Sequence, residues 1–154
     1  MPTAMIDSKQ YEVLAYAGAL PFIACAVLPW IGMPDVAGIG NYADIAAIYG
    51  VAIASFMAGV HWGTFLYQAG SVPVNLLLTS NAITVAVWLS FVLAPAAVSL
   101  AVIAAAFLLL LAVDFRLARA GLLTTDYLRT RRNVTLIVLG ALMLTIGSLW
   151  TASR

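Results

Sequence analysis

The chain has 154 residues, of which 64% are hydrophobic and only 8% are charged, with a formal net charge of +1. No soluble domain of this length needs so much apolar surface, so the composition predicts an all-α integral membrane protein with one transmembrane domain over residues 1–154. The low net charge, and the lack of a basic run interleaved with aromatic residues, argue against a nucleic-acid partner. With one cysteine (Cys25) and one histidine (His61), the chain has too few ligands for a structural zinc site and cannot form an internal disulfide.

Five apolar runs are long enough to cross a bilayer at about 20 residues per crossing. They cover about residues 13–31, 42–67, 75–93, 97–115 and 134–150. In the first run, Pro21 should kink the helix and Pro29 should mark its end. A loop rich in Gly and Pro follows, and either Asn41 or Asp44 is placed to cap the second helix. We expect the first run to remain as a signal anchor, since it is too long for the apolar core of a cleavable signal peptide.

The segment Arg116–Arg132, between the fourth and fifth runs, is expected to be one extended polar connection that lies partly at the membrane surface. It carries five arginines, whereas Lys9 precedes the first run and Arg154 is the one basic residue on the other side. The positive-inside rule then predicts a cytoplasmic N-terminus and an external C-terminus. Most of these arginines are interpreted as topology markers that contact anionic headgroups.

His61 lies within the second apolar run, in the pentapeptide Gly59–Gly63. A titratable imidazole is costly in a bilayer, so it is by default a functional hypothesis. At about 100° per residue, its side of the helix also carries Gly50, Ala54, Met57, Thr64 and Gln68. His61 therefore either hydrogen-bonds a neighbouring helix, as buried polar groups must, or it binds a ligand or handles a proton.

Small residues form a second side of the same run. Ser55, Gly59 and Gly63 recur every four residues, the pattern that lets another helix approach closely. Gly140 and Gly147 belong to a similar stripe in the fifth run. With protein-facing patterns on two sides, the second helix is predicted to be central in the bundle.

Polar residues gather in the half of the predicted bundle that faces the cytoplasm. They suggest a ligand-binding pocket open to the cytoplasmic leaflet, lined by His61, Trp62, Asn81, Asp114 and Asn133. The alternative is that these groups only pair one helix with another. For Asp114 we expect an interfacial pair with Arg116 or Arg119 rather than a deep proton relay.

The pentapeptide GVHWG resembles the signature of a family of small bacterial inner-membrane proteins of unknown function, which includes the mitochondrial transmembrane protein 69. The segment Asp126–Arg131, just before the last span, is similar to the aromatic-Leu-Arg segment of that family. The resemblance extends from about Tyr11 to Trp150. It implies a multi-span inner-membrane protein, and it implies no activity.

These features favour a non-enzymatic accessory or binding protein of the energy-converting inner membrane. It would hold a hydrophobic small molecule, or it would dock on a larger respiratory or photosynthetic membrane complex or on a second copy as a homo-oligomer. A quinone or a lipid fits better than haem, because one histidine supplies one axial ligand. The alternatives are a structural subunit or assembly factor without a ligand, and a proton-coupled carrier that acts as a dimer. An intramembrane enzyme is the least favoured reading, since no nucleophile–base pair or two-metal carboxylate set is visible.

Overall fold

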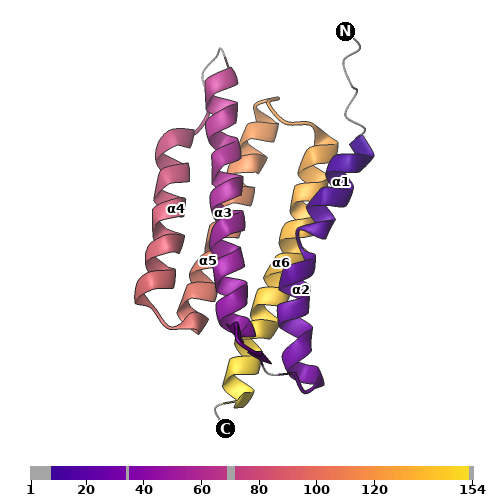
Figure 1. The fold of residues 1–154 in the computed structure, drawn as a ribbon. Coiled ribbons are helices and arrows are strands. Elements are labelled where there is room, and N and C mark those ends of the chain that lie inside the picture. Colours follow the sequence, from indigo (N-terminus) through magenta and orange to yellow (C-terminus); the bar gives the residue numbers. More distant parts are fainter. Residues whose placement is uncertain (1–7, 34, 69–71, 153–154) are drawn as a thin grey trace.

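The computed structural model describes residues 8–33, 35–68 and 72–152, and its helices lie side by side in an elongated bundle (Figure 1). The elements are α1 (Ser8–Ala17), α2 (Leu20–Val27), the 3₁₀ helix η1 (Leu28–Ile31), β1 (Asp35–Val36), β2 (Gly40–Asn41), α3 (Tyr42–Tyr67), α4 (Leu76–Leu93), α5 (Ala96–Arg119) and α6 (Thr125–Ala152). Five segments are long and apolar enough to cross a membrane: Lys9–Ile31, Tyr42–Tyr67, Leu76–Leu93, Ala96–Arg119 and Thr125–Thr151. The prediction of an all-α bundle with five such helices is confirmed.

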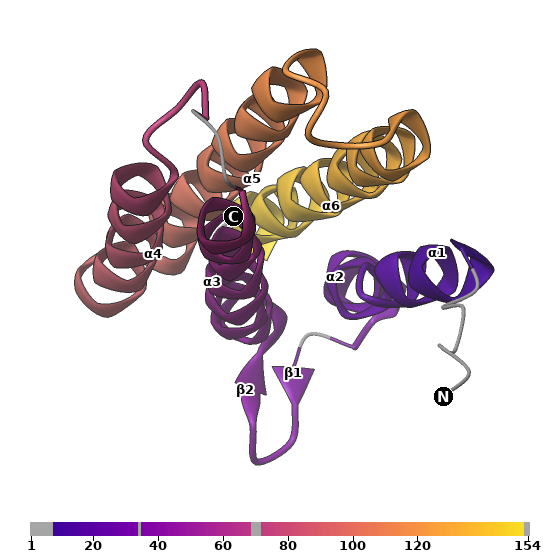
Figure 2. The same cartoon turned by 90° about the horizontal axis from the view of Figure 1, so that it is seen from above.

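Helix α3 occupies the centre of the bundle. It packs against α2, α4, α5 and α6, while α1 and α2 stand at the outside against α6 (Figure 2). The prediction that this helix is central is therefore confirmed.

The first span is broken rather than merely kinked. α1 ends at Ala17 and α2 begins at Leu20. Pro21 has no backbone N–H, and its ring clashes with the carbonyl four residues earlier, so the helix cannot continue through Ala17. The hydroxyl of Tyr49 on α3 donates a hydrogen bond to the carbonyl of Gly18 at 3.0 Å. A neighbouring helix thus satisfies a carbonyl at the break, as a membrane interior requires.

The connection from the first span to α3 has more order than the predicted loop. Pro29 lies in the first turn of η1, which ends at Gly32 in the left-handed conformation (φ 87°). A short antiparallel ladder follows, in which Asp35 pairs with Asn41. The side chain of Asn41 then accepts a hydrogen bond from the N–H of Asp44 at 2.9 Å, so Asn41 is the residue that caps α3.

The prediction that Arg116–Arg132 is an extended polar connection is wrong, because most of it is helical. α5 continues to Arg119, and a short turn with Gly121 at φ 76° leads directly into α6. Thr124 accepts a hydrogen bond from the N–H of Tyr127 at 3.3 Å and so caps this start. α6 has 28 residues and is about 42 Å long, against about 30 Å for the hydrocarbon core. Apolar content marks where a helix crosses the hydrocarbon, but polar turns extend it into the headgroup region.

Close packing between α3 and α5 is centred on Gly50. A Cβ atom there would lie 2.9 Å from Cγ2 of Ile103 and 3.6 Å from the ring of Phe22. The Phe22 ring also contacts those of Tyr49 and Phe107, at centroid distances of 5.0 and 6.0 Å. Between Tyr42 and His61, the other buried side chains of α3 are all small: Ala43, Ala46, Ala47, Ala54 and Ala58. These alanines let the central helix approach its neighbours.

The stripe Ser55, Gly59 and Gly63 does not form such a contact within the chain. A Cβ atom at Gly59, Gly63 or Gly140 would meet nothing within 4 Å, whereas one at Gly147 would lie 3.9 Å from a tryptophan side chain. Ser55 is half-buried. The expected helix packing at Gly59, Gly63 and Gly140 is thus not found in the single chain, because the alanine face around Gly50 already serves α5.

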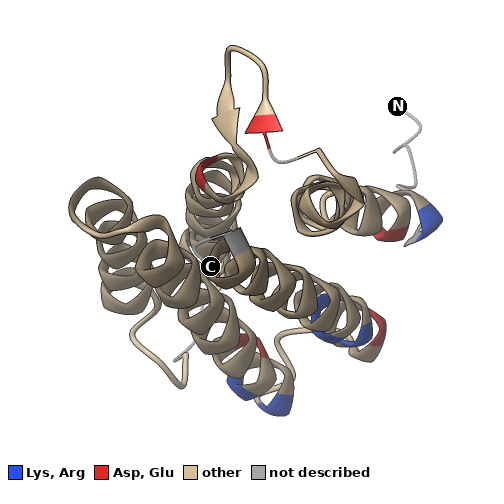
Figure 3. Ribbon diagram, turned by 90° about the horizontal axis from the view of Figure 1, so that it is seen from below, with Lys and Arg blue, Asp and Glu red and all other residues tan. Residues whose placement is uncertain are grey.

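Basic side chains gather where α1 begins and where α5 turns into α6, and we call this the basic end of the bundle (Figure 3). It holds every basic residue that the structure describes: Lys9, Arg116, Arg119, Arg129, Arg131 and Arg132. The opposite end carries Asp35 and Asp44.

Candidate functional site

Three ionisable side chains from three helices meet inside the basic end. His61 on α3 lies with Nε2 at 2.9 Å from Oδ1 of Asp114 on α5, and Nε of Arg131 on α6 lies 2.9 Å from Oδ2 of the same carboxylate. His61 and Asp114 are each 2% exposed, and Arg131 is 11% exposed. We call these three residues the ion triad.

The geometry of the ion triad assigns its protons. Two donors converge on Asp114, and an ionised carboxylate only accepts hydrogen bonds, so Nε2 of His61 carries a hydrogen. Nδ1 of His61 is buried and has no hydrogen-bond partner among the described residues. With a neutral imidazole, the charges of Asp114 and Arg131 cancel, which is how charged groups are tolerated inside a membrane protein. Nδ1 then presents an unused lone pair.

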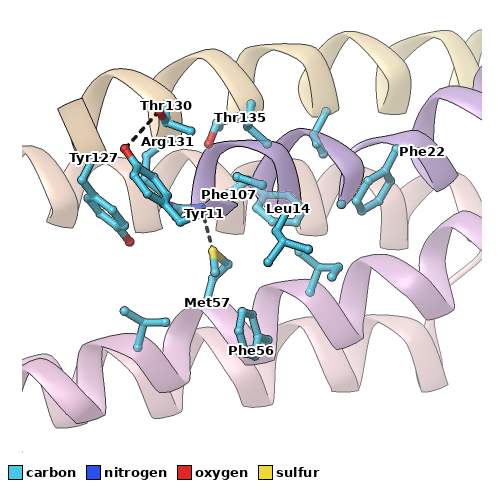
Figure 4. Close-up of a pocket in the computed structure, with 16 residues that line it drawn as sticks. Tyr11, Leu14, Phe22, Phe56, Met57, Phe107, Tyr127, Thr130, Arg131 and Thr135 are labelled. Atoms are coloured by element: carbon cyan, nitrogen blue, oxygen red, sulfur yellow. Dashed lines mark hydrogen bonds between the residues drawn. The ribbon is translucent and has the colours of Figure 1, made fainter. Parts of the chain in front are cut away.

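Arg131 connects the ion triad to a neighbouring cavity. Its Nη1 donates to Sδ of Met57 at 2.7 Å, and both residues line that cavity (Figure 4). His61 and Asp114 do not line it. The guanidinium therefore stands between a buried carboxylate and an apolar space.

The cavity has a volume of about 350 Å³ and lies between α1–α2, α3 and α6, with one residue from α5. We call it the groove. Its lining is almost wholly apolar: Leu14, Ala15, Gly18, Phe22, Ile53, Phe56, Met57, Val60, Phe107, Val134 and Val138, with Tyr11, Tyr127, Thr130, Arg131 and Thr135. Leu14 and Phe56 line it from opposite helices and are 72% and 67% exposed, so the groove opens on the outer surface of the bundle (Figure 4).

Polar groups cluster where the groove meets the basic end. The Tyr11 hydroxyl lies 3.4 Å from Oγ1 of Thr130, and the rings of Tyr11 and Tyr127 are 6.3 Å apart (Figure 4). Arg131 stands beside them, and it is the one charged residue in the lining. The groove is therefore amphipathic along its length, with a polar head region and an apolar body.

Of the five residues proposed for a ligand pocket, the structure brings two together. His61 and Asp114 are bonded, but Trp62 is 41% exposed, since the next residue on a helix points about 100° away. Asn81 is exposed and donates to a carbonyl four residues earlier on its own helix. Asn133 donates to a tyrosine hydroxyl on α1 at 3.4 Å. None of the five lines the groove, so the pocket is not built as expected.

The expected partner of Asp114 is also corrected. Arg116 and Arg119 follow it on α5, at spacings that do not bring side chains of one helix face to face, and both are exposed. The carboxylate instead pairs with Arg131 across the bundle.

Arg131 is the residue of the candidate site that the sequence pattern did not single out. It was assigned to the polar connection, but the helical period links it to the buried side of α6. Thr135, Val138 and Leu142 follow it at four, seven and eleven residues, and all three are buried. Extending that face toward the N-terminus of the helix would have identified Arg131 as a core arginine.

Comparison with known proteins gives one match. The family model described as "Protein of unknown function (DUF3429)" matches residues 8–147. No curated protein and no solved structure matches. Within the described residues, no group of three or more His, Cys, Asp or Glu side chains could hold a metal ion.

Proposed function

Since the chain belongs to the DUF3429 family, whose function is unknown, its role has to be inferred from its site, and we propose a non-enzymatic membrane protein that binds a lipophilic small molecule. The groove between α1–α2, α3 and α6 is the binding site. A quinone or a lipid is the class of ligand that suits it. The link to the mitochondrial transmembrane protein 69 stays a prediction.

One observation carries this proposal: the amphipathic groove of about 350 Å³ that opens on the outer surface. Small-molecule sites are typically cavities of about 300–1,000 Å³ with mostly apolar walls and a few polar groups that orient the ligand. The exposed Leu14 and Phe56 belong to helices apolar enough to lie in a bilayer, so a ligand would enter from the lipid. Haem fits less well, because the one histidine of the sequence could supply only one axial ligand and does not line the groove.

The proposed orientation places the basic end in the cytoplasm. By the positive-inside rule, the basic residues there favour a cytoplasmic N-terminus and an external C-terminus, in a bacterial inner membrane. The polar head region of the groove would then lie near the cytoplasmic leaflet.

A structural subunit or assembly factor is the second candidate, and the open stripe at Gly59 and Gly63 favours it. Because none of the residues that the structure describes would contact a Cβ atom at either glycine, a helix of a larger membrane complex or of a second copy could approach there. In that case Gly59→Leu would break an assembly. The groove would then be occupied by bulk lipid only.

Binding is tested by filling the groove. Purified protein in nanodiscs is extracted, and the lipophilic molecules that it retains are compared by mass spectrometry between wild type, Leu14→Trp and Leu66→Trp. Both leucines are exposed, at 72% and 68%, but only Leu14 lines the groove. We expect Leu14→Trp to lose a molecule that wild type and Leu66→Trp retain in fixed proportion. Identical extracts from all three proteins would contradict the proposal.

A further inference from the structure

Arg131 belongs to two sites at once. Its Nε is bonded to the buried carboxylate of Asp114 at 2.9 Å, and its side chain lines the groove beside the hydroxyls of Tyr11 and Thr130. An ion that binds this guanidinium reduces the share of its positive charge that compensates the carboxylate of Asp114. The groove and the ion triad are therefore electrostatically connected through one side chain.

We propose that the groove binds a single-chain anionic amphiphile, a fatty-acid-like carboxylate from the bilayer, and that binding is coupled to the uptake of one proton by His61. This inference rests on the proposed function and deepens it by naming the ligand class and the coupled proton.

Charge complementarity identifies the head of the ligand. The groove is lined by one cation and no anion, since Asp114 lies behind Arg131 and does not face the space. A guanidinium offers five N–H donors in a planar fork that suits carboxylates, and only part of this capacity is used by Asp114 and Met57. The hydroxyls of Tyr11 and Thr130 add donors beside it.

The shape of the groove identifies the tail. Beyond the head region the walls are apolar as far as Phe22 and Phe107, with the exception of Thr135. A volume of about 350 Å³ is at the low end for small-molecule sites, so the groove suits one alkyl chain rather than two.

Charge balance explains the proton. In the free protein, Asp114 and Arg131 cancel; a ligand carboxylate that shares Arg131 leaves one negative charge in excess among buried groups. Excess charge is costly inside a membrane protein. A proton from the solvent that binds the Nδ1 lone pair of His61 restores neutrality, while Nε2 keeps its hydrogen bond to Asp114. No other bond forms or breaks.

His61 is the group placed to accept this proton. From the helices packed against α3, it faces Asp114 on α5 and Arg131 on α6, and Tyr127 on α6 interacts electrostatically with both of these. α4 carries no ionisable residue. Cys25 lies in the last turn of α2, and Figure 1 shows α2 in the half of the bundle away from the basic end. An imidazole is also the side chain that changes charge near neutral pH.

The ligand class is tested in nanodiscs, with empty nanodiscs as reference, using palmitate, hexadecanesulfonate and hexadecanol. We expect the two anions to bind at least about tenfold more tightly than the alcohol, equivalent to one charge-assisted contact. This preference should vanish in Arg131→Gln. Because that variant leaves Asp114 without its partner, the Asp114→Asn/Arg131→Gln double variant provides a neutral pair if the single variant does not fold. An alcohol that binds as tightly as the anions would overturn the assigned class.

The coupling is tested by counting protons. Hexadecanesulfonate stays ionised at neutral pH, so any proton taken up on binding goes to the protein. Calorimetry in two buffers of different ionisation enthalpy should report uptake of about one proton per ligand in wild type, and none in His61→Gln, whose amide keeps a donor toward Asp114. By linkage, affinity for the sulfonate should fall by up to about tenfold per unit rise in pH in wild type, and should be flat in His61→Gln.

The outcomes separate the two proposals. If Leu14→Trp retains and binds the same lipophilic molecules as wild type, then both the proposed function and this inference fail. If no probe binds saturably although Leu14→Trp loses a molecule that wild type retains, then only the inference fails. If the anions bind in the groove without proton uptake, or if His61→Gln takes up the same proton, then only the inference fails.

Discussion

The two ends of the bundle are held together in different ways. At the basic end, three buried ionisable side chains meet across α3, α5 and α6, and both His61 and Arg131 are bonded to the carboxylate of Asp114. In the opposite half, α3 packs against α5 and α2 through Gly50, Ile103, Phe22 and a row of alanines. Apolar packing needs only matching shape, whereas buried charges need specific partners. Apolar residues alone would hold the basic end together, so the buried ions there are the feature that the proposed function has to explain.

The largest effect is expected at the ion triad. Asp114→Ala should lower the free energy of unfolding by about 3–5 kcal/mol, because it leaves the guanidinium of Arg131 buried without a carboxylate. The matched control is Asp126→Ala, which removes an exposed pair with Arg129 at 3.8 Å and should cost less than about 1 kcal/mol. Denaturant titration in mild detergent, followed by circular dichroism, measures both. Equal losses would mean that the triad is not a buried ionic unit.

A smaller loss of stability is expected in the half of the bundle opposite the basic end. Gly50→Leu places side-chain atoms where Ile103 already lies 2.9 Å from the Cβ position, so it should cost about 1–3 kcal/mol. Gly59→Leu enters open space and should stay within about 0.5 kcal/mol. The same unfolding titration measures the pair. If Gly59→Leu instead shifts the protein to a smaller species on size-exclusion chromatography, then the open stripe is an oligomer contact.

The hydrogen bond that supports the break between α1 and α2 should contribute less to stability than the packing around Gly50. Tyr49→Phe removes the hydrogen bond to the carbonyl of Gly18 and should cost about 0.6 kcal/mol, the average for hydrogen bonds between membrane helices. Tyr67→Phe serves as control, since Tyr67 is 90% exposed. Amide hydrogen exchange around Gly18 should rise in Tyr49→Phe only. Unchanged exchange would show that the break does not depend on this bond.

The smallest changes in stability are expected for substitutions of two buried serines. Both Ser80 and Ser99 are 1% exposed; Ser80 donates to a carbonyl of its own helix at 2.6 Å, whereas Oγ of Ser99 has no partner among the described residues. Ser99→Ala should therefore leave stability unchanged or raise it by up to about 0.5 kcal/mol, and Ser80→Ala should lower it slightly. Thermal unfolding with many replicates resolves the two signs. A clear loss in Ser99→Ala would indicate that its hydroxyl is hydrogen-bonded in the membrane.

The sequence by itself determined the class and the number of helices. Runs of apolar residues longer than about 20 have one stable form in a bilayer, because every backbone polar group must be bonded within the helix. A disruption of the helix near Pro21, a cap at Asn41 or Asp44, the central place of α3 and the concentration of basic residues at one end were also predicted from the residues. The full break between α1 and α2 and the choice of Asn41 as the cap came from the structure. An ionisable side chain in an apolar helix is costly in a bilayer, so the sequence alone also identified His61 as a candidate site residue.

Only the tertiary structure decided which polar groups meet. His61, Asp114 and Arg131 are separated by 53 and 17 residues along the chain, and helical period gives a direction for each side chain but not the neighbour on that side. The same ambiguity affected the small residues. Gly50 and Gly59 both lie in α3 among other small side chains, and only the structure shows that α5 packs on the face of Gly50. The groove could not be foreseen either, since it is space left between helices that are distant in sequence. Its walls are apolar residues that, taken singly, look like any other lipid-facing or core position.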